Sequence, residues 1–139
     1  MNSLFVDTSG WANAFVSSET YHSQAQQYIL DAWQSQRPFI TTSYIIAELV
    51  ALLQSPLRIP RNTIFQVVDS IKQSEHIQVI HINPEIDAEA WQLCKNRPDK
   101  AWSLVDCTSF VVMQQSGLQE ALTTDHHFEQ AGFLRLLKP

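Results

Sequence analysis

Short apolar segments alternate along this chain with stretches in which apolar residues recur every three or four positions, and this alternation limits the fold to the α/β class. Helical periodicity is clear in residues 21–32, 64–71 and 86–94. Because helical stretches rather than tight turns separate successive strands, the sheet should be largely parallel. Strands are predicted at Leu4–Val6, Pro38–Thr41, Ile77–Ile82, Ala121–Thr123 and Leu134–Leu136.

Local start and stop signals agree with this division. The pair Asn83-Pro84 predicts a helix that begins with an asparagine cap and a proline in its first turn. Gly117 predicts the end of a helix over residues 104–115. Neither a repeat nor a long linker divides the 139 residues, so residues 1–139 are interpreted as a single domain.

Composition narrows the class of protein. Hydrophobic residues make up 45% and charged residues 17% of the chain, which is ordinary for a globular protein. No run approaches the ~20 apolar residues of a membrane helix, and no targeting segment is visible, so we expect a cytoplasmic protein. The net charge of −5 argues against a general nucleic-acid coat. Cys94 and Cys107 form no metal-ligand pattern and are expected to be buried thiols.

Four acidic residues occupy positions where a carboxylate is costly or oddly placed. Asp7 ends the first apolar segment, and Glu48 interrupts the apolar run of residues 44–53. Asp106 lies among apolar neighbours, and Asp125 ends another apolar segment. An ionised carboxylate in apolar surroundings is destabilising unless it is paired or bound to a metal. Four such residues in a short chain suggest that they share a cation.

The predicted elements place these acids at one edge of the sheet. Asp7 and Asp125 directly follow predicted strands, and sites in open parallel sheets form beyond the carboxyl ends of the strands. Glu48 and Asp106 lie near the beginnings of predicted helices, which belong to the same edge. Oxygen ligands without His or Cys partners suit Mg²⁺ or Mn²⁺ rather than zinc. A hard divalent ion at this edge favours hydrolysis of a phosphodiester.

Each acid also has a purely structural interpretation. Asp7 and Asp125 could cap the helices that follow them, and Asp106 completes the S-x-x-D pattern of a capping box. Glu48 has the weakest alternative, because the pattern predicts a buried side chain with no cation three or four positions away. One of the adjacent histidines His126 and His127 could contact RNA or help to position Asp125, but a place at the surface or in a cap is favoured.

Four stretches of the chain join these acids to hydroxyl and apolar residues in a fixed order: Phe5–Ser9, Thr42–Glu48, Ser103–Cys107 and Leu122–Phe133. Together they resemble the PIN-domain proteins, and most of all the VapC-type ribonuclease toxins of bacterial toxin–antitoxin pairs. The resemblance spans nearly the whole chain. It implies a single three-layer α/β/α domain with a mostly parallel, five-stranded sheet in which the first and fourth strands are adjacent.

The resemblance also implies a function. It is that of a Mg²⁺- or Mn²⁺-dependent endoribonuclease with an RNA substrate, a small antitoxin as its partner, and a second copy of itself in a homodimer. Thr8 matches the hydroxyl beside the first aspartate of the family, and Thr124 matches the hydroxyl just before the last one. The acidic positions, which would be both catalytic and metal-binding, are matched by Asp7, Glu48, Asp106 and Asp125.

Two other functions stay open on the sequence alone. A phosphomonoesterase of the haloacid-dehalogenase type would carry a second aspartate two positions after the first, and Ser9 occupies that position here. A non-catalytic RNA- or protein-binding module of the same fold would keep the acids for structure. Such a module would not bind Mn²⁺, which distinguishes it from the nuclease.

Overall fold

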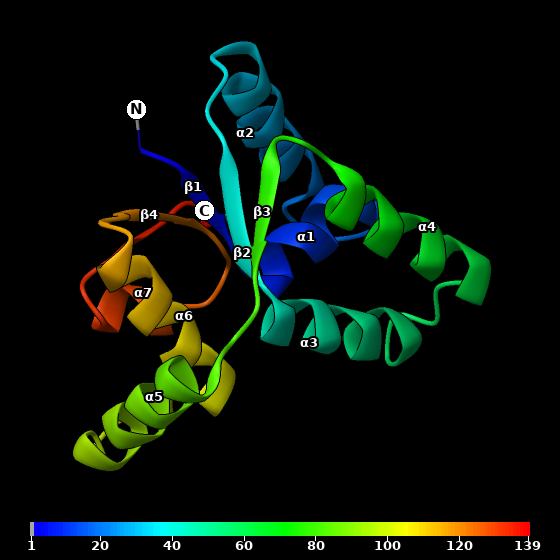
Figure 1. The fold of residues 1–139 in the computed structure, drawn as a ribbon. Coiled ribbons are helices and arrows are strands. Elements are labelled where there is room, and N and C mark those ends of the chain that lie inside the picture. The colour runs from blue at the N-terminus through cyan, green and yellow to red at the C-terminus, as the bar shows by residue number, and fades with distance from the viewer. Residues whose placement is uncertain (1) are drawn as a thin grey trace.

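The computed structural model describes residues 2–139, and the five strands found there form one sheet (Figure 1). The strand order is β3-β2-β1-β4-β5, and every neighbouring pair is parallel. The α/β class, the parallel sheet and the adjacency of the first and fourth strands are therefore confirmed. The strands are β1 Leu4–Val6, β2 Phe39–Thr42, β3 Ile77–Ile80, β4 Glu120–Leu122 and β5 Leu134–Arg135.

Within residues 2–139, seven helices surround the sheet: α1 Thr8–Phe15, α2 His22–Gln34, α3 Ser43–Gln54, α4 Arg61–Gln73, α5 Pro84–Asn96, α6 Leu104–Gln115 and α7 His127–Gln130. Helices α1, α2 and α4 lie on one side of the sheet, and α5, α6 and α7 lie on the other (Figure 1). The predicted three-layer arrangement is thus confirmed. In the described part of the chain, none of these helices has the length and apolar character needed to cross a bilayer.

The capping signals in the sequence act as predicted. The side chain of Asn83 caps α5 by accepting the Ile86 N–H at 2.8 Å, and Pro84 is the first residue of this helix. Gly117 lies just after the end of α6 with a φ of +66°, a conformation that glycine adopts without strain. These caps fix the ends of the two helices that pack together on the α5–α7 side of the sheet.

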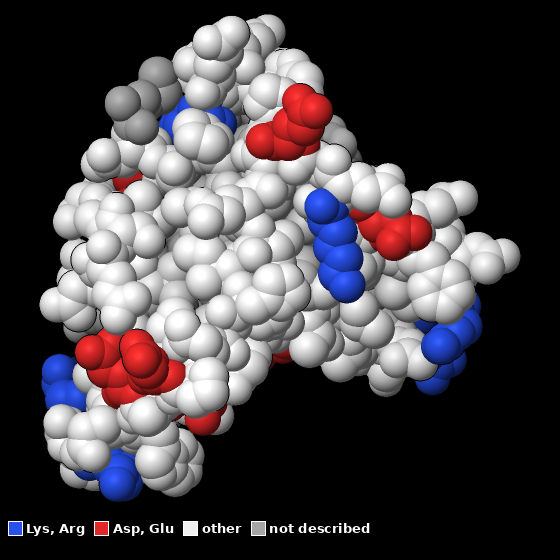
Figure 2. Space-filling view, in the orientation of Figure 1, with Lys and Arg blue, Asp and Glu red and all other residues white. Residues whose placement is uncertain are grey.

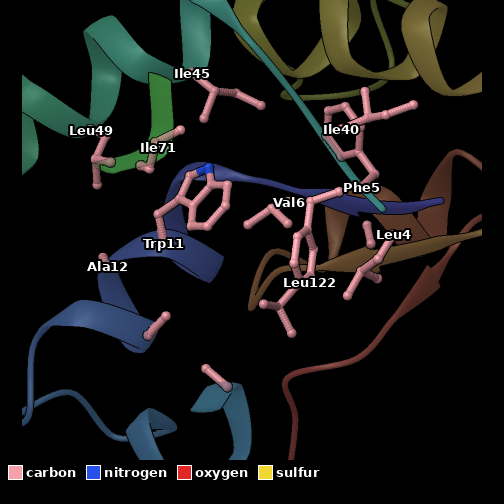
Figure 3. Close-up of a cluster of buried hydrophobic side chains, with 14 of the residues drawn as sticks. Leu4, Phe5, Val6, Trp11, Ala12, Ile40, Ile45, Leu49, Ile71 and Leu122 are labelled. Carbon is pink, nitrogen blue, oxygen red and sulfur yellow. The ribbon is translucent and has the colours of Figure 1, made fainter. Parts of the chain in front are cut away.

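The hydrophobic core surrounds the central strand β1 and its neighbour β2 (Figure 3). All three residues of β1 are buried, as the apolar segment at residues 4–6 predicts for a central parallel strand. Trp11 of α1 is also buried, and its indole N–H donates to the Thr41 hydroxyl at 3.1 Å. That hydroxyl in turn donates to the Val6 carbonyl oxygen at 2.9 Å. This chain of hydrogen bonds fastens α1 to both β1 and β2.

The two cysteines lie together between α5 and α6, with 2.8 Å between their sulfur atoms, and both are free thiols. Cys107 is fully buried as predicted, whereas Cys94 is partly exposed. Burial raises the pKa of the Cys107 thiol from 9.0 to about 12. This thiol is therefore protonated at neutral pH and is a poor nucleophile and a poor metal ligand.

Helix α1 approaches β4 so closely that only glycine fits at one position. A Cβ atom on Gly10 would lie 2.1 Å from the backbone oxygen of Leu122, far inside van der Waals contact. The same oxygen accepts the Asp7 N–H at 3.2 Å. Gly10 therefore sets the distance between the first turn of α1 and the end of β4, which is where Asp7 and Asp125 lie.

Replacing Gly10 with alanine should destabilise the fold, although alanine favours a helix over glycine by about 1 kcal/mol. The added methyl group must displace backbone rather than a flexible side chain, so we expect a loss on the order of 3 kcal/mol. Gly117→Ala is the control, because a Cβ there meets nothing within 4 Å and only the positive φ is strained. Urea unfolding followed by circular dichroism measures both variants. A Gly10→Ala protein as stable as the parent would contradict the close approach.

Candidate active site

Asp7 directly follows the carboxyl end of β1 and is buried beside the carboxyl end of the neighbouring strand β4. Its side chain is only 6% exposed, and its Oδ2 atom accepts the hydroxyl hydrogen of Thr123 at 2.8 Å. Asp7 occupies the N-cap position of α1, but its side chain makes no capping hydrogen bond. The helix-capping interpretation of Asp7 is therefore wrong, and the carboxylate is turned toward β4 instead.

Glu48 differs from its prediction, because its side chain is exposed rather than buried. Helix α3 is amphipathic, and the residues of its inner face, such as Ile45 and Leu49, are fully buried. Glu48 falls on the opposite face, although its neighbours in the sequence are apolar. The Thr8 hydroxyl donates to Glu48 Oε1 at 2.5 Å and ties α3 to the first turn of α1.

Asp106 forms the predicted capping box at the start of α6. Its backbone N–H donates to the Ser103 hydroxyl at 3.0 Å, and its Oδ2 atom accepts the Ser103 N–H at 3.1 Å. The same Oδ2 atom lies 3.0 Å from the Nδ1 atom of His127. Capping therefore uses one oxygen of Asp106 and leaves the other one available.

Asp125 also has a capping role, because its Oδ1 atom accepts the backbone N–H of His127 at 2.9 Å, at the start of α7. The ring of His127 lies between Asp125 and Asp106, with Nδ1 at 3.3 Å from Asp125 Oδ1. Its side chain is 20% exposed, whereas that of His126 is 63% exposed. His126 therefore lies at the surface, as expected, while His127 is part of the site.

Burial and mutual repulsion raise the pKa values of two of the four acids. Burial raises the pKa of Asp7 from 3.8 to about 7, a hydrogen bond from Thr123 opposes this shift, and the charges of Asp106 and Glu48 add to it. Burial also raises the pKa of Asp106, and the charge of Asp125 raises it further. Asp7, Glu48 and Asp125 line one cleft, and the ring of His127 joins Asp106 to Asp125, so the structure brings all four predicted acids together.

The chain holds each of the four carboxylates at one oxygen only. Within residues 2–139, the oxygens that accept geometrically sound hydrogen bonds are Asp7 Oδ2, Glu48 Oε1, Asp106 Oδ2 and Asp125 Oδ1. The second oxygen of each carboxylate accepts no such bond from this part of the chain. Nor does any Lys or Arg of residues 2–139 form an ion pair with these acids. Free carboxylate oxygens without a cationic partner fit a hard divalent cation.

A cleft of about 500 Å³ opens over Asp7, Glu48 and Asp125, whereas Asp106 is not part of its lining. Both hydroxyl residues predicted from the sequence line it, but neither hydroxyl contacts the aspartate beside it. Thr8 donates to Glu48 rather than to Asp7, and Thr124 contributes its backbone N–H, which donates to the Ser9 hydroxyl at 2.9 Å. The lining residues are Asp7, Thr8, Ser9, Glu48, Leu52, Thr124, Asp125 and His126.

Three residues that were not among the predicted site residues complete the arrangement: Thr123, Ser9 and His127. The hydroxyl of Thr123 holds Asp7, and the hydroxyl of Ser9 lies 3.1 Å from that of Thr123. A signal for Thr123 was present, because it is the polar residue directly after a buried strand. A signal for His127 was its place at the start of a helix that follows an aspartate. Ligand atoms of Asp125, His126 and His127 also lie within 4.8 Å of one another.

The fold and the site define an α/β protein with a group of acids at the carboxyl edge of a five-stranded parallel sheet. Residues 4–134 match the PIN domain, and the chain belongs to the PIN domain family. The 23S rRNA-specific endonuclease VapC20 of Mycobacterium tuberculosis is 30% identical over 134 residues, which are 96% of this chain and 97% of that protein.

Solved structures agree with this assignment. The crystal structure of Mycobacterium tuberculosis VapC20, described as a sarcin–ricin loop cleaving toxin, matches with a TM-score of 0.83 and 28% identity over 99% of this chain and 100% of that one. A Pyrobaculum aerophilum protein matches with a TM-score of 0.66 and 15% identity, over 97% and 84% of the two chains. The FitAcB structure from Neisseria gonorrhoeae has a TM-score of 0.64 and 13% identity, over 98% and 97%. At such identities the last two show the fold alone.

The raised pKa of Asp7 predicts how the stability of the metal-free protein depends on pH. The folded state binds the Asp7 proton more tightly than the unfolded chain does, so this contribution is complete below pH 3.8 and is lost as the pH rises to about 7. By the usual conversion, the loss is up to roughly 4 kcal/mol. The variant Asp7→Asn carries no such charge. Its advantage in stability over the parent should therefore grow between pH 4 and pH 8.

Urea unfolding in the presence of a chelator, repeated across this pH range, measures the difference. Asp69→Asn on the exposed side of α4 is the control and should track the parent at every pH. An Asp7→Asn protein whose advantage does not change with pH would show that Asp7 is ionised throughout the range.

Proposed function

We propose that this protein is a metal-dependent endoribonuclease, which hydrolyses phosphodiester bonds in RNA and is the toxin of a toxin–antitoxin pair. The observation that carries this proposal is the set of free carboxylate oxygens at one edge of a PIN-domain sheet. A hard cation and the phosphate of an RNA substrate would together neutralise this group. Lys and Arg are scattered over the face shown in Figure 2, which favours binding at a metal-centred site over binding across a basic surface.

The four acids would hold Mg²⁺ or Mn²⁺ through the oxygens that the chain leaves free. When bound, such an ion supplies an activated water and stabilises the charge that develops on the phosphate. The chain itself orients the ligands: Thr123 fixes Asp7, and Thr8 fixes Glu48. Because each hydrogen bond holds one oxygen, the other oxygen of each carboxylate keeps a fixed direction.

Removing the charge of a single acidic residue of the site should abolish cleavage without unfolding the protein. Asp7→Asn keeps an oxygen that can accept the Thr123 hydroxyl, and Asp106→Asn keeps one that can accept the Ser103 N–H, so both variants should fold. We expect each to lower the rate of Mn²⁺-dependent RNA cleavage by at least about a hundredfold, since a metal ligand is lost. Gel assays with a labelled RNA pool measure this rate.

Asp69→Asn serves as the matched control, because it changes the same functional group on the exposed surface of α4. Parent-like cleavage by both site variants would contradict the assignment of the site. Failure of the parent to bind Mn²⁺ in calorimetry would instead favour the non-catalytic module of the same fold.

The similarity to VapC20 supports a particular RNA substrate, 23S rRNA. VapC20 is named as a 23S rRNA-specific endonuclease, and the two proteins align over nearly their full lengths. We propose that this chain also cleaves 23S rRNA, in the sarcin–ricin loop. A metal-centred cleft of this size in an acidic protein suits one exposed loop of a folded RNA better than long stretches of duplex.

Purified ribosomes incubated with the protein and Mg²⁺ should therefore acquire a single cut in 23S rRNA, at the sarcin–ricin loop. Primer extension across the rRNA maps the cut, and the Asp7→Asn protein supplies the uncut control. Cleavage confined to transfer RNA, or spread over many rRNA sites, would refute this choice of substrate. It would leave the proposed nuclease activity in place.

An apolar groove supports the proposal of a protein partner, for which a small antitoxin is the expected candidate. The groove has a volume of about 540 Å³ and lies between α1, α2 and α4. Three large apolar side chains in its lining are exposed: Phe15 by 43%, Leu30 by 47% and Trp33 by 55%. Apolar side chains grouped in this way are typical of a protein-binding surface. The homodimer remains a prediction from family resemblance.

A further inference from the structure

His127 stands apart from the other residues of the site because its ring contacts two carboxylates that belong to different elements. Its Nδ1 atom lies 3.0 Å from Asp106 Oδ2 and 3.3 Å from Asp125 Oδ1. Asp106 is in the first turn of α6, whereas Asp125 precedes α7. One imidazole ring therefore spans the gap between the two segments that carry these acids.

The chemistry of the two carboxylates determines which atom donates the hydrogen in these contacts. An ionised carboxylate only accepts hydrogen bonds, so the Nδ1 atom must carry a hydrogen. The shorter distance assigns this hydrogen to Asp106 Oδ2. Asp125 is held by a different group of the same residue, since the backbone N–H of His127 donates to Asp125 Oδ1 at 2.9 Å. His127 thus holds one acid with its ring and the other with its main chain.

We propose that His127 is a positioning residue, which orients Asp106 and Asp125 so that their free oxygens face one divalent cation. This inference rests on the proposed metal-dependent function of the site. With Oδ2 of Asp106 occupied by the Ser103 N–H and the His127 ring, its Oδ1 atom is left for a cation. In the same way, the bond to Asp125 Oδ1 leaves Oδ2. Hydrogen bonds that fix ligating carboxylates in this manner commonly change metal affinity by about 10- to 100-fold.

A direct ligand role for the His127 Nδ1 atom does not fit this arrangement. A nitrogen that carries a hydrogen has no lone pair to offer a metal. His126 is mostly exposed, and its Nδ1 atom is 3.8 Å from Asp125 Oδ1, too far for a hydrogen bond. His126 therefore lacks the bridging contact that distinguishes His127.

The test is calorimetric titration of the RNA-free protein with Mn²⁺ alone. His127→Ala should weaken Mn²⁺ binding by about 10- to 100-fold. His127→Asn places an amide N–H near the position of Nδ1 and should retain most of the affinity. His127→Gln places its amide near the position of Nε2 and should bind as weakly as the alanine variant. His76→Ala, at an exposed histidine just before β3 and away from the site, is the control and should bind Mn²⁺ like the parent. Circular dichroism checks that each variant is folded.

The outcomes separate this inference from the proposed function. A parent protein that does not bind Mn²⁺ would refute the proposed function itself. If the parent binds Mn²⁺ but the asparagine and glutamine variants bind it equally well, His127 does not act as a positioning residue. Electron spin echo spectra of the Mn²⁺ complex add a second readout. We expect no signal from a nitrogen of His127, and a bound-nitrogen signal that is lost in His127→Ala would overturn the positioning role.

Discussion

The parallel pairing of β1 with β4 determines where the charged side chains of this protein meet. The two strands are more than a hundred residues apart in the sequence, yet their pairing places Asp7 beside Thr123 at the carboxyl edge of the sheet. Gly10 permits the approach of α1 that this geometry needs, because any Cβ at that position would meet the Leu122 backbone. The hydroxyl of Thr8 then draws Glu48 of α3 to the same edge. The site therefore depends on one strand pairing and on the close contact that glycine allows.

Neutral donors, rather than opposite charges, hold these like-charged groups together. Hydroxyl and N–H groups bind one oxygen of each carboxylate, while Lys and Arg of residues 2–139 form their ion pairs elsewhere. A nearby lysine or arginine would stabilise the metal-free protein and would compete with any cation. Hydrogen bonds from neutral groups orient the carboxylates without cancelling their charge. The raised pKa of Asp7 is a direct result of this arrangement, because a buried carboxylate without a cation is destabilised in its ionised form.

Much of this fold could be predicted from the sequence, because its signals are local. Apolar segments marked all five strands of residues 2–139, and Asn83-Pro84 marked the start of α5. The four acids could be chosen because carboxylates are rare in apolar runs. The exposure of Glu48 was not predicted. In a run of apolar residues the sequence does not indicate which face of the helix is buried, and the packing of α3 decides this. The roles of Thr123 and His127 depend on contacts with residues far away or across two helices, which no local pattern encodes.

The acids also differ in their access to water, and this difference has a kinetic consequence. Glu48 is on the exposed face of α3, whereas Asp7 lies at the buried end of the same cleft. An ion diffusing in from bulk solvent would meet the hydrated charge of Glu48 first, where dissolved salt screens the attraction. It would lose more of its water only on reaching Asp7, where the lower dielectric strengthens the attraction. Ionic strength should thus govern how fast an ion enters, and the buried aspartate how long it stays.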